Sequence, residues 1–308
     1  MSTTKLPSRI SVSHLDNPQV AFHFDFSDGQ HASNRIACEF LSGFGDLESW
    51  QILDNERYRF IVIDVSEVDL SIEQAAAKAY KELLEQVRPS KHPYLLRIWN
   101  YFPAINQGQG DKERYRGFCV GRSQSVDGQF NTPPPAATAI GTNGIAEDKS
   151  GFHLQLIALC SSQVARTLEN PRQTPAWRYP REYGPVPPGF SRGIILDEDT
   201  ETPRLLASGT ASIVGHVSQH IGEVAGQLSE SLSNLEALLA EGSKQSGRDF
   251  YLSDCEALRV YLRKPEDLPV AESIITAAGI DRDRVLYLHG DICRRELDVE
   301  LEGVFVAA

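Results

Sequence analysis

A strand–helix–strand pattern that occurs twice is the feature of this sequence that most constrains its fold. In the first occurrence, the apolar, β-branched run YRFIVIDV at 58–65 predicts a buried strand. Ser71 then begins a helical segment, and Gln74 completes a capping box with it. The run YLLRIWNYF at 94–102 predicts the second strand of the unit.

The second occurrence follows the same order. We expect a strand at 205–214, interrupted by Gly209, and another at 257–263. Between them, apolar residues spaced by four and three predict one face of a helix, and Gly242 is placed to end it. These apolar residues are Val224, Leu228, Leu232, Leu235 and Leu239. The chain is expected to close with a short helix at 267–278 and with strands at 284–292 and 297–306.

The strands that follow the two long helices resemble each other, with LRIW at 96–99 and LRVY at 258–261. Because the two matches fall at the same place in each unit, they indicate a tandem duplication. Helices on one face of a mixed, mainly antiparallel sheet give an α+β fold. We therefore expect two tandem α+β domains, at 1–150 and 151–308.

The composition argues against several classes of function. The 308 residues include 42 acidic and 30 basic side chains, a net charge of −12, which argues against nucleic-acid binding. No apolar run approaches the ~18 residues of a membrane span, and the first residues lack a secretory leader. The five cysteines are scattered, without a C-x-x-C pair. We expect a cytoplasmic protein with no membrane or nucleic-acid partner.

Motifs for nucleotides and for metals are missing from the sequence. His216 and His220 have helical i,i+4 spacing, but no carboxylate lies near them at ligand spacing. Histidines of the core or surface are the simpler interpretation. We expect no metal and no organic cofactor.

A proline-rich segment at 170–192 separates the two units. It holds six prolines and four arginines, together with Trp177, Tyr179, Tyr183 and Phe190. One interpretation is a linker on the surface. The other is a stiff loop lining a pocket, because prolines reduce the entropy lost on ordering.

The final strand carries a row of acidic residues. With a period of two, Asp298, Glu300 and Glu302 share one face. Such a row is typical of a solvated surface. However, Val304 and Val306 continue the same face, and a carboxyl in a half-apolar site would have its pKa raised, as a general acid requires. Both interpretations remain open from spacing alone.

Several of these segments are recognisable together. ASGTASIVG at 207–215 and LDVELEGV at 297–304 run in the order of the YjgF/RidA-type (chorismate-mutase-like) fold. VELE at 299–302 resembles the Val-Glu-Ile-Glu signature of that family, whose first glutamate is catalytic and corresponds here to Glu300. The arginine with which that family holds a carboxylate has no evident counterpart.

The chain after about residue 55 resembles the chorismatases, which carry this fold in duplicate. The matching stretches are LRIWNYFPAINQGQGDKERYRGFCVGR at 96–122, PPAATAIGT at 134–142, FSRG at 190–193, SGTASIVGH at 208–216 and ICRRELDVELEG at 292–303. The first fifty residues match nothing recognisable.

The resemblance implies that Glu300 protonates the methylene of the enolpyruvyl ether of chorismate, so that pyruvate is released. Cys293, seven residues earlier, resembles the members that form 3-hydroxybenzoate, with some 4-hydroxybenzoate allowed. A small aliphatic residue there is typical of hydrolases that give a dihydroxycyclohexadiene carboxylate. Gly209 goes with the cysteine type. Without the resemblance, Cys293 would be interpreted as a small buried hydrophobe.

Chorismate carries two carboxylates, and each calls for a fork-shaped cation. The candidates for substrate binding are Arg192 and Tyr183 in the proline-rich segment and Arg263 at the end of its strand. Arg259 is expected to pair with a surface acid instead.

Other functions remain open. They are a chorismate hydrolase, an imine or enamine deaminase of the parent fold, and a non-catalytic binder of small acids. Chorismate is the expected small-molecule partner. The parent fold is trimeric, so the duplicated chain is expected to be a monomer or a homotrimer.

Overall fold

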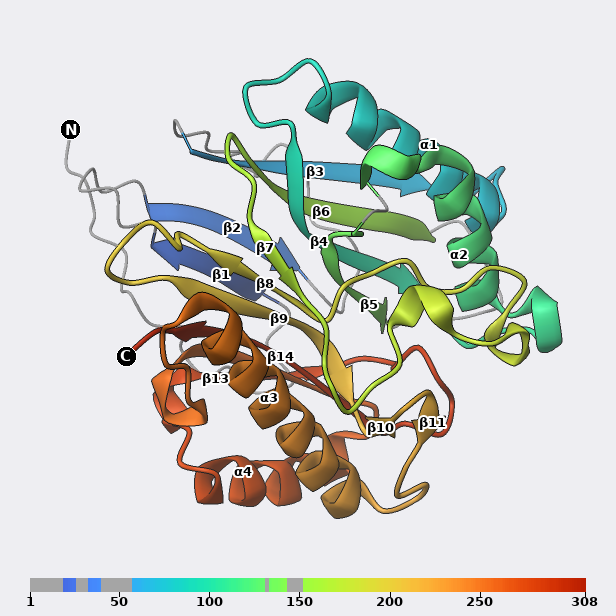
Figure 1. Cartoon of the computed structure of the whole chain (residues 1–308). Helices are drawn as coiled ribbons and strands as arrows, with labels where there is room; N and C mark the ends of the chain where they lie inside the picture. The colour runs from blue at the N-terminus through green and yellow to red at the C-terminus, as the bar shows by residue number, and fades with distance from the viewer. Residues whose placement is uncertain (1–18, 26–32, 40–56, 131–132, 143–151) are drawn as a thin grey trace.

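The structure is a computed structural model that describes residues 19–25, 33–39, 57–130, 133–142 and 152–308. Near the N-terminus, β1 (Gln19–Asp25) and β2 (Ser33–Glu39) form an antiparallel pair. The rest of the described chain forms two large sheets, one small two-stranded sheet and the helices that cover the large sheets (Figure 1). Part of the expected N-terminal domain lies outside the described residues.

The first sheet has four strands in the order β3-β6-β4-β5. Strands β4 and β5 are parallel, and β6 runs antiparallel to both of its neighbours. The strands are β3 (Tyr58–Ser66), β4 (Tyr94–Pro103), β5 (Ala136–Thr142) and β6 (His153–Ser161). The helices are α1 (Ile72–Val87) and α2 (Arg114–Ser125).

The second sheet has six strands in the order β13-β12-β14-β9-β8-β7. Only β12 and β13 are parallel. The strands are β7 (Arg166–Leu168), β8 (Gly193–Leu196), β9 (Arg204–Ala211), β12 (Cys255–Leu262), β13 (Val285–His289) and β14 (Val299–Val306). The helices are α3 (Val224–Ser246) and α4 (Leu268–Ala277), and β10 (Ile213–Val214) pairs with β11 (Val217–Ser218).

The two sheets share one topology. Chain order β3-α1-β4-α2-β5-β6 matches β9-α3-β12-α4-β13-β14, and corresponding strands take the same places in each sheet. In both, the one parallel pair links the strands on either side of the second helix. The predicted α+β fold with an internal duplication is confirmed. We call residues 58–161 the first half and 204–306 the second half.

The strand pairing bears on where the halves divide. Strand β6 begins after residue 150 but pairs with β3 and β4. Since β6 lies between two strands of the first sheet, we propose placing the boundary after Ser161, rather than between 150 and 151.

Local signals explain how the two long helices begin and end. At α1, the Gln74 N–H donates to the Ser71 hydroxyl (3.2 Å), and the Ser71 N–H donates to the Gln74 side chain (2.9 Å). Helix α3 continues past Gly242, its predicted end, and stops before Gly247, which has a left-handed φ of 71°. Gly242 is instead a packing position, because a Cβ there would lie 2.4 Å from Leu205.

The sheets pack face to face with the helices outside. Figure 1 shows α1 and α2 on one side of the molecule and α3 and α4 on the other, with the strands between. One buried cluster joins side chains of both sheets, including Leu96, Trp99 and Ile157 from the first half and Leu206 and Leu286 from the second. The candidate functional residues lie along this joint between the halves.

Candidate active site

A cavity of about 390 Å³ opens between the two halves. Its walls come from α2, β5, β9, β14, the loop at 293–296 and the proline-rich segment 170–192, which we call the strap. The strap contacts the first half at Ser191, which forms a β-bridge with Ala136 of β5. This volume lies within the range of small-molecule sites.

Glu300 lies in the wall of the cavity and is 4% exposed. It lies on β14, between Tyr261 of β12 and Ala211 of β9. Within the described residues, no hydrogen bond reaches its carboxyl group. Burial, and secondarily the charge of Glu302, raises the pKa of Glu300 to about 8, while Arg97 and Arg192 act in the opposite direction. The carboxyl is therefore mainly protonated at neutral pH, as a general acid must be.

Gly209 on β9 leaves the space that the Glu300 carboxyl occupies. A Cβ at position 209 would lie 2.0 Å from Oε1 of Glu300 and 3.2 Å from the methyl group of Thr138. The Gly209 N–H donates to Oγ1 of Thr138 (2.9 Å). Any side chain here would displace the acid.

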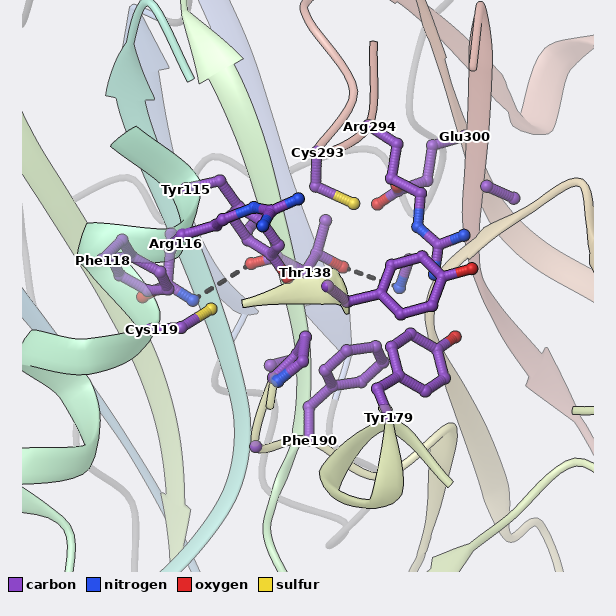
Figure 2. Close-up of a pocket in the computed structure, with 18 of the residues that line it drawn as sticks. Tyr115, Arg116, Phe118, Cys119, Thr138, Tyr179, Phe190, Cys293, Arg294 and Glu300 are labelled. Atoms are coloured by element: carbon purple, nitrogen blue, oxygen red, sulfur yellow. Dashed lines mark hydrogen bonds between the residues drawn. The ribbon is translucent and has the colours of Figure 1, made fainter. Parts of the chain in front are cut away.

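Cys293 points into the same space as Glu300 (Figure 2). Burial, followed by the charge of Glu300, raises the pKa of its thiol well above the ordinary range. Cys119 on α2 also lines the cavity, and burial raises its pKa to about 12. Both cysteines are therefore neutral thiols at physiological pH, and Cys293 is the one beside the acid.

Three arginines face the cavity without an ion pair in the described part of the chain. The Arg192 guanidinium donates to the Tyr179 hydroxyl (2.7 Å) and lies 5.0 Å from the Phe190 ring centroid. Arg294 lies 4.1 Å from the ring centroid of Tyr183. Arg122 packs against Gly189 and the Tyr80 ring. Cations that lack carboxylate partners suit an anionic ligand.

The strap forms part of the site. Tyr179, Tyr183, Phe190 and Arg192 all line the cavity, which favours the pocket-loop interpretation over a surface linker. Tyr183 also packs with the ring of His216, at 5.6 Å between centroids. Aromatic rings and a guanidinium on one stiff segment provide a surface for a flat, charged ligand.

Two arginines lie elsewhere than the sequence suggested. Arg263 does not line the cavity: it is paired with Asp291 (2.6 Å) and donates to the carbonyls of Leu297, Ile292 and Arg294. Arg263 comes directly after β12, beside the loop that carries Cys293. Its guanidinium binds the backbone of that loop instead of facing the cavity. Arg259 is buried and pairs with Glu302, not with a surface acid.

Sequence reasoning did not select several cavity residues. They are Tyr80, Asn100, Glu113, Tyr115, Arg116, Cys119, Arg122, Thr138, Arg294, Arg295 and Glu296. Some of these residues lie within the stretches at 96–122 and 292–303 that carried the family resemblance. That resemblance is the signal that could have identified them. Among the described residues there is no group of three or more His, Cys, Asp or Glu placed to hold a metal. In the same residues, no helix is long and apolar enough to cross a membrane.

Comparisons with known proteins agree with this geometry. Residues 44–158 match the family model described as chorismatase FkbO/Hyg5-like, N-terminal. A chorismatase of Streptomyces hygroscopicus is 35% identical, over 95% of this chain and 85% of its own length. A 3-hydroxybenzoate synthase of the same organism is 33% identical, over 75% and 69%. A chorismatase crystal structure superposes with a TM-score of 0.73 and 31% identity, covering 92% of this chain and 90% of its own.

A duplicated α+β chain with a buried acid in a cation-lined cavity is an enzyme for a small anionic substrate. The comparisons identify it more closely. The chain belongs to the chorismatase family.

Proposed function

We propose that this enzyme converts chorismate into 3-hydroxybenzoate and pyruvate, with Glu300 as the proton donor. The observation that carries the proposal is a buried carboxyl, protonated at neutral pH, beside a thiol in a cavity lined by arginines. The relatives support it, since they include proteins named chorismatase and 3-hydroxybenzoate synthase.

The reaction begins at the enolpyruvyl ether. Its methylene carbon takes the proton of Glu300 and becomes the methyl group of pyruvate, leaving positive charge on the ether carbon. The ring hydroxyl next to the ether captures that carbon and gives up its proton. The bond from the ring to this second oxygen then breaks, and that oxygen leaves as the keto oxygen of pyruvate. The bond between the captured carbon and the original ether oxygen breaks as well, and the ether oxygen stays on the ring and takes back the proton as the phenol. Loss of a ring proton then completes the aromatic product and restores the acid.

This sequence consumes no water, because 3-hydroxybenzoate and pyruvate together hold every atom of chorismate. No step transfers electrons to or from a cofactor, so the expectation of a cofactor-free enzyme is consistent with it. If water captured the cation instead, the enzyme would be a hydrolase that releases a dihydroxycyclohexadiene carboxylate. The strap and Cys293 form part of the cavity wall, and we propose that they keep water from the cation, which favours capture within the substrate.

The two carboxylates of chorismate are assigned to the cavity arginines. Arg122, Arg192 and Arg294 are the candidates, because each faces the cavity with no carboxylate partner among the described residues. Tyr183 and Phe190 contribute ring faces beside two of these cations. Arg263 is no longer a candidate for direct contact.

The test compares wild-type enzyme with Glu300→Gln on chorismate, measuring pyruvate release and separating the aromatic products by chromatography. We expect equimolar pyruvate and 3-hydroxybenzoate from the wild type. Loss of a positioned general acid lowers the rate about 10²–10⁴-fold. A folded Glu300→Gln enzyme with a wild-type rate would remove Glu300 from this role, and a wild type that releases no pyruvate would leave a deaminase or a small-acid binder.

A further inference from the structure

Beyond the cavity, the duplicated sequence motif converges on a single buried carboxylate. Arg97 and Arg259 occupy equivalent places in LRIW on β4 and LRVY on β12, and both form ion pairs with Glu302. The Arg97 pair measures 2.6 Å. The aromatic residues of the same motifs also donate to Glu302, Trp99 through its indole N–H (3.1 Å) and Tyr261 through its hydroxyl (2.8 Å).

Glu302 is thus held from both halves at once. Its donors come from β4 and β5 in the first half and from β12 in the second, and the residue is 3% exposed. Burial alone would raise the pKa of Glu302, but Arg259 and Arg97 hold it below the ordinary value. The carboxylate is therefore charged at the joint between the sheets.

A short chain of contacts links this cluster to the cavity. The Thr138 hydroxyl on β5 donates to Glu302 (2.5 Å) and accepts from the Gly209 N–H (2.9 Å). Gly209 in turn lies directly against the Glu300 carboxyl. Glu302 and Glu300, both on β14, are thus connected through Thr138 and Gly209.

Stability alone is a poor explanation for this cluster. Buried ion pairs often stabilise a fold no more than apolar side chains of the same shape would. Arg97, Arg259 and Glu302 together leave one net positive charge in the joint. Such an arrangement is better explained by what it does to its neighbour.

We propose that Glu302 is a positioning residue for the reaction: held by the duplicated arginines, it fixes the wall behind Glu300 and sets the electrostatic field in which Glu300 holds its proton. This inference rests on the proposed role of Glu300 as proton donor.

Several charged or titratable groups face Glu300. Glu302 on its own strand makes ionisation of Glu300 harder, whereas Arg97 on β4 and Arg192 at the end of the strap make it easier. Cys293 on the preceding loop and Tyr115 on α2 are neutral and also interact with it. Of these, Glu302 and Arg97 belong to the cluster, and they act with opposite sign.

Because Glu302 and Arg97 shift the pKa of Glu300 in opposite directions, substituting each of them in the full-length enzyme gives opposite predictions. Glu302→Gln removes the negative charge and leaves the two arginines uncompensated, so Glu300 should lose its proton at lower pH. The alkaline limb of kcat/KM against pH should move to lower pH by about one unit or more. Arg97→Met removes a positive charge with similar shape, so the same limb should move to higher pH.

A matched control lies two residues before Glu300. Asp298 lies directly before β14 and is paired with Lys264 (3.0 Å), but it does not line the cavity. Asp298→Asn removes a charge at the same distance along the chain and should leave the alkaline limb in place. Thermal unfolding of each variant shows whether it is folded, and Arg97→Met carries the test if Glu302→Gln is not.

The outcomes separate this inference from the proposed function. Folded cluster variants with slower rates but an unshifted alkaline limb would show a purely structural cluster and overturn the inference. If Glu300→Gln is inactive in the same assay, Glu300 is retained as the proton donor and only the proposed role of Glu302 is rejected. If Glu300→Gln is fully active, the proposed function itself falls.

Discussion

Glu300 and Glu302 lie two positions apart on one strand, but their surroundings give them opposite protonation. Glu302 faces two guanidinium groups and a phenol, which stabilise its charge. Glu300 faces Gly209, a neutral thiol and the cavity, where burial favours the proton. The same residue type therefore favours the protonated form at position 300 and the charged form at position 302.

The identity of residue 293 should decide which product forms. We predict that Cys293→Ala keeps pyruvate release but shifts product from 3-hydroxybenzoate toward the hydrated diene. A smaller side chain admits water beside the cation, and the weak S–H donor next to the acid is lost. Chromatography of the products at matched turnover measures the ratio.

The second cavity thiol provides the comparison for this prediction. Cys119→Ala removes a thiol that comes from α2 and not from the loop next to Glu300, and it should leave the product ratio as in the wild type. An unchanged product ratio in Cys293→Ala would show that the Cys293 thiol contributes to packing and not to the choice of product.

At the scale of elements, the strap lines the cavity, and we predict that Arg192 of the strap contributes to the affinity for chorismate. A charge-assisted hydrogen bond is worth roughly 1.5–3 kcal/mol, so Arg192→Gln should raise the KM for chorismate about tenfold or more. Arg178→Gln, in the same strap but exposed and outside the cavity lining, is the control. Equal KM values for both variants would place the carboxylate contact on Arg122 or Arg294.

The site could be predicted from the sequence only where its residues, or a residue and its partner, lie close together along the chain. Glu300 and Cys293 lie within one short motif, so the family resemblance selected them, and the strap was suggested by its prolines and aromatic residues. The roles of Arg259 and Arg263 could not be derived, since their partners Glu302 and Asp291 reach them only through strand pairing. The opposite protonation of Glu300 and Glu302 depends on Arg97, which is 205 residues from Glu302 along the chain.

The elements themselves were more predictable than their ends. A capping box located the first long helix, apolar periodicity located the second, and apolar runs located the strands beside them, because all of these signals are local. Gly242 misled because a glycine that allows close packing inside a helix has the same sequence signature as one that ends it. The boundary that we propose after Ser161 differs from the predicted one for a related reason, since only sheet pairing links β6 to β3 and β4.

At the scale of the whole molecule, the duplication creates the site. Neither half encloses the cavity alone: α2 and β5 come from the first, while β9, β14 and the loop at 293–296 come from the second. The chain carries a net charge of −12, but guanidinium groups gather in the cavity. A cationic cavity in an acidic protein concentrates its field on the substrate, away from the outer surface.

The central claim is that Glu300 holds a proton at neutral pH inside this joint. Infrared difference spectroscopy tests it directly, by following the C=O stretch of a protonated carboxyl in wild type and in Glu300→Gln as the pH is raised. We predict a band in the wild type that disappears with a midpoint at a pH of about 8, because burial raises the pKa of Glu300 to about 8, and that is missing in the variant. A wild-type spectrum identical to that of the variant, or a midpoint near the ordinary value of about 4.3 for glutamate, would contradict the account.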